Sequence, residues 1–168
     1  VKKSVECSLG PGTSQYNARL QYQTYDVGGL LNVGKNEILV TVGDGWWRGD
    51  TGYGGVRNSF GTDLAILCQL EIDRKTVLIS DKSWSASQEG PLGLNDLMQG
   101  ECYDARKENI CEWHPVTEKQ FGYENLVCSN SFDVVEKENF IGKQIHTPNG
   151  EVVIDFGQNN AGYVKFGF

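Results

Sequence analysis

The chain of 168 residues is expected to be all-β: a jelly-roll-like β-sandwich with long loops, followed by a linker and a partial second β domain. Glycine is frequent, at 21 residues, which favours turns and works against long helices. Short runs of alternating or β-branched residues recur along the chain, separated by turn residues. Two long irregular stretches, residues 43–61 and 88–101, are typical of loops at one end of a sandwich.

The first expected strand is residues 19–25 (RLQYQTY), which alternate apolar and polar side chains as a half-buried strand does. A turn or single helical turn is expected at 26–31, with Asp26 as its N-cap. Residues 37–42 (EILVTV) are rich in β-branched and apolar side chains. They predict a buried strand.

The next expected strand is residues 63–72 (DLAILCQLEI), which is apolar on both faces at its centre. Asp73-Arg74-Lys75 is expected to turn the chain back into a strand at 76–80. A shorter strand is expected at 83–87 after a polar turn. These runs supply most of the sheet in the first predicted domain.

The composition changes after Trp113, where residues 115–143 become polar and irregular in the manner of a connecting segment. Residues 151–156 and 162–168 then predict a strand–turn–strand unit around Gly157 to Asn160. Such a hairpin is marginal alone, so we expect it to lean on the preceding domain or on further polypeptide.

The predicted domains are therefore residues 1–114, a jelly-roll-like accessory domain, and residues 115–168, a linker with the first strands of a second β-sandwich. Strand edges left open in these domains would allow self-association.

Charge and cysteine content exclude several classes of protein. The net charge is −7 and no basic stripe is visible, which argues against a nucleic-acid binder. No apolar run is long enough to cross a bilayer, and no signal peptide is evident, so no membrane partner is expected. The cysteines are odd in number and lack C-x-x-C spacing, which favours reduced thiols and a cytoplasmic rather than secreted location. They are Cys7, Cys68, Cys102, Cys111 and Cys128.

Four segments, in order, resemble the N-terminal region of bacterial α-L-rhamnosidases. They are LQYQTYDV at 20–27, GDGWWRG at 43–49, GECYDAR at 100–106 and DFGQNNAG at 155–162. The resemblance implies that the first three belong to a β-jelly-roll, related in some members to a calcium-using rhamnose-binding module. It implies that the fourth opens a second β-sandwich ahead of an (α/α)₆ catalytic barrel.

The resemblance also implies that hydrolysis belongs elsewhere. The family's acid and base carboxylates lie in the barrel, in an acidic motif with Arg and Trp, and nothing like that motif occurs in this sequence. No catalytic residue is therefore assigned. The sequence departs from the family at its start, because only ten residues precede Pro11 where the family has further strands. We expect the N-terminal strands of the jelly roll to be missing or altered.

The loop from Trp46 to Asn58 is the best candidate for binding carbohydrate, because sugar C–H faces pack on indole rings and hydroxyls bond to Arg, Asn and Asp. The alternative is that Trp46 or Trp47 plugs the end of the sandwich and Arg48 pairs with an acid. The predicted carbohydrate-binding residues are Asp44, Trp46, Trp47, Arg48, Arg57, Asn58, Asn95 and Asp96.

Calcium is a possible cofactor. Asn95 and Asp96, together with Asp44 and Asp50, could supply oxygen ligands, although solvation of the loops is the simpler reading. Asp104 and Arg106 are expected to pair with each other or with a loop, in a structural role.

The sequence thus predicts a non-catalytic, carbohydrate-binding segment whose partner is an L-rhamnose-containing glycan. The alternative is a structural spacer that packs on the enzyme's own catalytic domain and binds no sugar. A stand-alone glycosidase is a third hypothesis.

Overall fold

The computed structural model describes residues 12–167, which form two compact units, 12–132 and 133–167. The predicted boundary after residue 114 stays a prediction. Cys7 and the expected N-terminal irregularity lie outside the described residues. The first unit holds β1 (Leu20–Tyr22), η1 (Gly28–Leu30), α1 (Gly45–Arg48), β2 (Gln69–Ile72), β3 (Lys75–Ile79), β4 (Ser85–Ala86), β5 (Leu92–Asp96), β6 (Gly100–Tyr103), η2 (Ala105–Lys107), β7 (His114–Pro115) and β8 (Leu126–Cys128). The second unit holds β9 (Lys143–His146) and β10 (Val152–Asp155).

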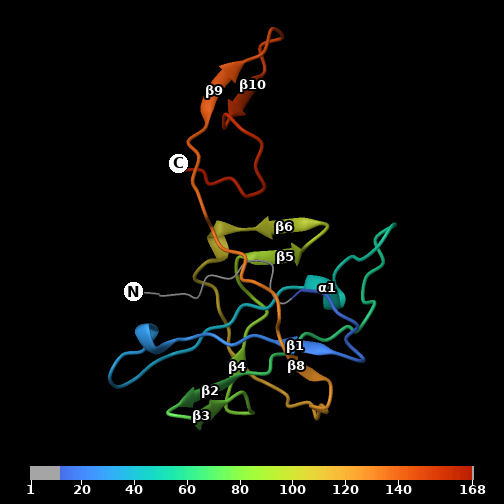
Figure 1. Ribbon diagram of the computed structural model, residues 1–168, viewed down its shortest axis with the longest axis vertical. Coiled ribbons are helices and arrows are strands. Elements are labelled where there is room, and N and C mark those ends of the chain that lie inside the picture. The colour runs from blue at the N-terminus through green and yellow to red at the C-terminus, as the bar shows by residue number, and fades with distance from the viewer. Residues whose placement is uncertain (1–11, 168) are drawn as a thin grey trace. The chain divides into compact units, whose positions relative to one another are not determined.

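Every sheet in the described residues is a pair of strands. The pairs β2–β3, β4–β7 and β5–β6 of the first unit and β9–β10 of the second are antiparallel, whereas β1 and β8 are parallel. Figure 1 labels both strands of every pair except β4–β7. The α-helical content of the described residues is a single turn, α1, and η1 and η2 are short 3₁₀ turns. The predicted all-β class is confirmed.

The turn between β2 and β3 was predicted correctly. Asp73 and Arg74 both have positive φ, at 51° and 62°, as the two central residues of a type I′ hairpin turn require. The predicted helical turn at 26–31 is also present, as η1, and Asp26 Oδ1 accepts a hydrogen bond from the Gly28 N–H at 2.9 Å. Its N-cap residue is nevertheless Val27.

Three of the expected elements were wrong. Residues 37–42 form no strand and are exposed along their length, because β propensity alone supplies no partner for the backbone groups. Residues 88–101, expected as a loop, contain β5 and the first half of β6. Residues 162–167 are not a strand, and β10 pairs instead with β9, across a turn closed by the Gly150 N–H and the Thr147 carbonyl oxygen at 2.9 Å.

The most buried side chains are charged. Among the described residues no apolar side chain is buried, whereas Asp44, Asp50 and Asp96 are exposed by only 6%, 5% and 6%. Aspartate is almost never buried without a partner. The three aspartates therefore direct attention to the groups that surround them.

No helix in the described part has the length and apolar character needed to cross a bilayer.

Candidate functional site

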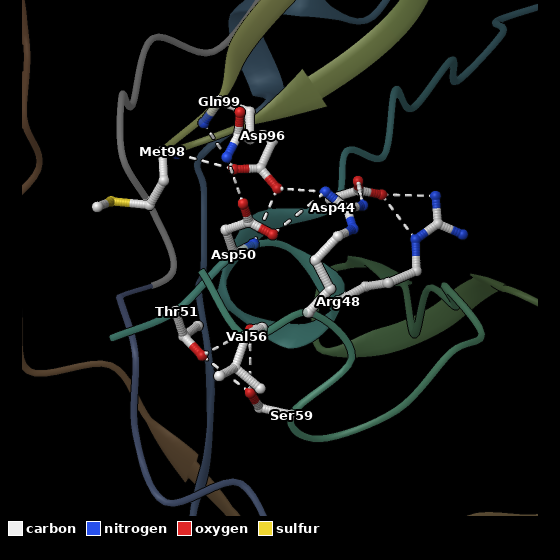
Figure 2. Close-up of polar contacts among 10 residues, drawn as sticks. Asp44, Arg48, Asp50, Thr51, Val56, Ser59, Asp96, Met98 and Gln99 are labelled. Carbon is white, nitrogen blue, oxygen red and sulfur yellow. Dashed lines mark hydrogen bonds and ion pairs between the residues drawn. The ribbon is translucent and has the colours of Figure 1, made fainter. Parts of the chain in front are cut away.

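The three buried aspartates meet two arginines where α1, the loop after it and the β5–β6 turn come together. Figure 2 shows Asp44, Arg48, Asp50 and Asp96 among the polar contacts of this region. We call Asp44, Arg48, Asp50, Arg57 and Asp96 the carboxylate–arginine network. Its members come from separate sequence segments: Asp50 and Asp96, for example, are 46 residues apart and hydrogen-bonded.

Asp44 binds one arginine on each of its oxygens. Arg48 Nε and Nη2 lie 2.7 and 2.5 Å from Asp44 Oδ1, and Arg57 Nη2 lies 2.5 Å from Oδ2. The first pair follows from helical geometry, since residues four apart share a helix face and the Arg48 N–H also donates to the Asp44 carbonyl at 3.1 Å. Asp44 thus holds two guanidinium groups side by side.

Asp96 ends β5 and has a side chain that is 0% exposed. Its Oδ1 accepts the N–H groups of Met98 and Gln99 at 2.8 and 3.0 Å, which shapes the turn into β6. Its Oδ2 accepts the Asp50 N–H and Arg57 Nη1, each at 2.9 Å. One carboxylate therefore joins the hairpin turn to the loop that follows α1.

Asp50 completes the network from the loop side. Gln99 Nε2 donates to Asp50 Oδ2 at 2.5 Å. Asp50 Oδ1 is buried without a hydrogen bond, and its nearest ionic partner is Arg57 Nη1 at 3.6 Å. The network contains three carboxylates and two guanidinium groups, so it carries one net negative charge when all five groups are ionised.

Hydrogen bonds shift the proton affinities in the direction that keeps the charges. The backbone N–H groups of Gln99 and Asp50 lower the pKa of Asp96, against the opposing effect of burial. The hydrogen bond to Asp44 raises the pKa of Arg57, and the charges of Asp96 and Asp50 raise it further while desolvation opposes them. Asp96 and Arg57 therefore form an ion pair at neutral pH.

Glycine is required beside the network at Gly49. A Cβ atom there would lie 2.7 Å from Asp96 Oδ2 and closer still to the Gly45 carbonyl oxygen. Gly49 has φ −69°, so its backbone conformation suits any residue and the restriction is one of space. Close approach of the chain to the Asp96 carboxylate depends on the missing side chain.

The two tryptophans of α1 have different surroundings. Trp47 packs with Tyr16 and Phe60 at ring-centroid distances of 5.5 and 6.2 Å, and its Nε1 donates to the Asp63 carbonyl at 3.0 Å. This supports the structural alternative for Trp47. Trp46 is half-buried and makes no hydrogen bond within the described residues, so its indole N–H remains available.

The predicted asparagines contribute through their backbones. The Asn95 carbonyl accepts the Asp44 N–H at 3.0 Å, and the Asn58 N–H donates to the Arg48 carbonyl at 2.9 Å. Asn58 has φ 60°, a left-handed conformation that asparagine tolerates better than most residues. Its side chain is exposed and free of hydrogen bonds within the described part of the chain.

The structure thus brings together Asp44, Arg48, Arg57 and Asp96 from the predicted set. It adds Gln99, Tyr16 and Phe60, which the sequence analysis did not assign to the site. Gln99 follows Asp96 by three residues, a spacing that suggests a turn, but its contact with Asp50 depends on tertiary structure. Neither aromatic residue had a pattern that marked it as a partner of Trp47.

The residues suggested for calcium do not fit a cation site as arranged here. The three carboxylates converge on the Arg57 guanidinium, and Asn95 directs its side-chain amide to Glu101 Oε2 at 3.3 Å. Among the described residues, no group of three or more His, Cys, Asp or Glu side chains is placed to hold a metal ion.

Asp104 and Arg106 make a separate ion pair with each other, which is one of the two pairings expected of them. Arg106 Nε lies 2.8 Å from Asp104 Oδ1, and Arg106 Nη2 lies 2.8 Å from Asp104 Oδ2. Asp104 also accepts a hydrogen bond from the Arg106 backbone N–H at the start of η2. The hydrogen bond from Arg106 lowers the pKa of Asp104. This pair is self-contained and exposed on the arginine side.

Comparison with known proteins identifies the family. The model of the α-L-rhamnosidase N-terminal domain matches residues 2–142. An α-L-rhamnosidase of Streptomyces avermitilis is 33% identical over 94% of this chain, and one of Formosa agariphila is 32% identical over 88%. The chain spans 16% of the length of each of these relatives. No solved structure matches it significantly. The chain belongs to the family of α-L-rhamnosidase N-terminal domains.

Proposed function

We propose that this chain is a non-catalytic accessory domain of a larger α-L-rhamnosidase and that it binds L-rhamnose-containing carbohydrate. The relatives are named for that activity, and the chain corresponds to about a sixth of their length. Cleavage of terminal α-L-rhamnose is assigned to the remainder of such a protein. In this proposal the domain holds the glycan while another module breaks the bond.

The observation that carries the proposal is a pair of arginines held rigidly at the surface. The side chains of Arg48 and Arg57 are 37% and 39% exposed, whereas that of their shared partner Asp44 is 8% exposed. Two nitrogens of each guanidinium are therefore fixed by carboxylates, and each group keeps further N–H bonds for a ligand. Donors fixed before binding lose little entropy when a sugar hydroxyl accepts from them.

Trp46 supplies the apolar part of the proposed site. It lies on α1 two residues before Arg48, it is only half-buried, and its indole N–H is unbonded within the described residues. An indole in the same chain segment as fixed donors suits a sugar, whose ring offers C–H groups on its faces and hydroxyls at its edge. Asn58, with an exposed side chain, is a further donor or acceptor in the same loop.

The proposal is tested by isothermal titration of the 168-residue chain with L-rhamnose, with and without calcium. Trp46→Ala is expected to weaken binding at least tenfold with little change in the circular dichroism spectrum. Trp113→Ala is the matched control, because Trp113 is 50% exposed and lies outside the loop. Equal loss of affinity in both variants contradicts a site at Trp46.

A second candidate function is a structural spacer that packs on the catalytic domain. The observation that favours it is the apolar surface of residues 37–42, where Ile38, Leu39, Val40 and Val42 are 39–58% exposed. Contiguous exposed apolar residues of this kind mark surfaces that other protein covers. Absence of heat with L-rhamnose in both titrations favours the spacer over the binding module.

The inactivity of the chain and its location are separate proposals. Hydrolysis of an aryl α-L-rhamnoside by highly purified chain contradicts a non-catalytic role.

A cytoplasmic location is supported by unpaired thiols, because the four cysteines in the described residues are free. Fractionation of the source cells checks it directly.

A further inference from the structure

We propose that Asp96 is a positioning residue, which acts on the carbohydrate through Arg57 and does not touch it. The inference rests on the proposed function and assigns a role within the same site. It divides the predicted binding residues into those that contact the ligand and those that fix the position of the contacting residues. Asp96, although its side chain is the most deeply buried of the network, belongs to the second group.

Burial excludes direct contact between Asp96 and a ligand in this conformation. Its side chain is 0% exposed, compared with 39% for Arg57. Both oxygens are also engaged, since each accepts two hydrogen bonds. A sugar hydroxyl could reach this carboxylate only by displacing the turn between β5 and β6 or the backbone of Asp50.

The same bonds fix where the Arg57 guanidinium lies. Arg57 projects from a loop that has little regular structure, with one isolated bridge between Thr51 and Val56. Asp96 accepts a hydrogen bond from Arg57 Nη1, and Asp44 accepts one from Arg57 Nη2. Two carboxylates from different segments therefore set the plane of the guanidinium. A planar group held at two nitrogens keeps a defined direction for its remaining N–H bonds.

Asp96 is in turn held by groups that cannot rotate away. Three of its four partners are backbone N–H groups, those of Asp50, Met98 and Gln99. Gly49 packs so closely that a Cβ atom would lie 2.7 Å from Oδ2. The backbone of the hairpin turn therefore fixes the Asp96 carboxylate, and that carboxylate in turn fixes the position of the Arg57 guanidinium.

The test compares L-rhamnose affinity across variants of the 168-residue chain by isothermal titration. Asp96→Asn is expected to weaken binding about tenfold, because an amide cannot accept all four hydrogen bonds. Arg57→Lys keeps the charge but replaces the planar guanidinium, which bonds the two carboxylates through separate nitrogens, with a single ammonium group. A loss at least as large is expected. The double variant is expected to lose no more than Arg57→Lys alone, since Asp96 acts on the ligand only through Arg57.

Asp104→Asn is the matched control. It breaks an aspartate–arginine pair of the same chemistry outside the site, and its affinity is expected to stay within twofold of the parent chain. Should Asp96→Asn fail to fold, Gly49→Ala crowds the same carboxylate, and also the Gly45 carbonyl oxygen of α1, without altering a charge. It is expected to weaken affinity while circular dichroism remains unchanged.

The outcomes separate the two proposals. Full affinity in folded Asp96→Asn or Gly49→Ala, together with loss in Arg57→Lys, overturns the positioning role and leaves sugar binding intact. Additive losses in the double variant also overturn it. No binding by the parent chain overturns the carbohydrate function itself, and the positioning role with it.

Discussion

Arg57 and Asp96, 39 residues apart in the sequence, are joined by a hydrogen bond of 2.9 Å between Nη1 and Oδ2. The pair connects the loop after α1 to the turn of the β5–β6 hairpin. Because the described residues include no buried apolar side chain, such polar contacts carry an unusual share of the organisation of this region. The stability of the region is therefore expected to respond to changes in charge.

Acid is expected to weaken the fold through Asp96. Hydrogen bonds from the Gln99 and Asp50 N–H groups hold the pKa of Asp96 below its usual value of 3.8. The stabilisation is thus complete above about pH 3.8 and is lost as the pH falls through the lower, folded-state pKa. Thermal unfolding followed by circular dichroism between pH 2 and 6 measures this loss.

The comparison with Asp96→Asn isolates that contribution, because the pKa values of Asp63, Asp81, Asp104 and Glu136 are lowered as well. The variant is expected to be less stable than the parent at pH 6, and the difference is expected to shrink as the pH falls. A constant difference across the range contradicts a role for Asp96 ionisation.

Truncation of Trp47 is expected to destabilise the first unit. Trp47 pairs with Tyr16 and Phe60, and each aromatic pair contributes about 0.5–1.5 kcal/mol, so Trp47→Ala is expected to lower the free energy of unfolding by about 1–3 kcal/mol. Urea denaturation measures the change. Trp113→Ala, at an exposed position without a ring partner among the described residues, is expected to have a smaller effect, and the reverse order contradicts the aromatic cluster.

Space beside Trp47 is tight at Gly61. A Cβ atom on Gly61 would lie 2.6 Å from Cζ2 of Trp47, so Gly61→Ala is expected to cost about 1–3 kcal/mol through overpacking. Gly12→Ala is the control, because a Cβ atom there has no neighbour within 4 Å. Equal denaturation midpoints for the two variants show that the ring moves aside freely.

Some features were predictable because they are local. The β2–β3 turn lies between two β-branched runs, and the Asp104–Arg106 pair spans two residues, so neighbouring sequence contains the information. The β5–β6 hairpin escaped prediction because Pro91, Gly93, Asn95 and Asp96 are residues that strands usually avoid. Here the Asp96 carboxylate, which accepts the N–H groups of the turn, offsets that poor propensity.

The candidate site was predictable in residue type but not in arrangement. Trp and Arg in a Gly-rich loop marked α1 and the following loop as a candidate binding surface, which stays a prediction. The sequence could not show that Asp44 and Asp96 would both bind the Arg57 guanidinium. That contact requires the loop that carries Arg57 to meet the β5–β6 turn, 39 residues further along the chain. The expected strand at 37–42 failed for a related reason, since a strand requires a partner that propensity does not supply.

The β2–β3 turn offers a stabilising substitution. Arg74 has φ 62°, a conformation that costs a residue with a Cβ atom roughly 1 kcal/mol and costs glycine little. Arg74→Gly is therefore expected to raise the free energy of unfolding by about 1 kcal/mol in urea denaturation. Lys75→Gly, one residue later and inside β3, is expected to lower it. A loss of stability in Arg74→Gly contradicts the type I′ geometry.

The exposed apolar segment at 37–42 is expected to promote self-association. Its residues form no strand ladder, and Val40 at its centre is 40% exposed. Val40→Lys places a charge in the segment, which opposes both apolar contact and edge-to-edge strand pairing. Sedimentation velocity over a range of concentrations is expected to show association of the parent chain and less association of Val40→Lys. Val33→Lys is the matched control, because Val33 is fully exposed outside the segment. A parent chain that sediments as a monomer at every concentration, or an equal effect of both substitutions, contradicts a role for this segment in association.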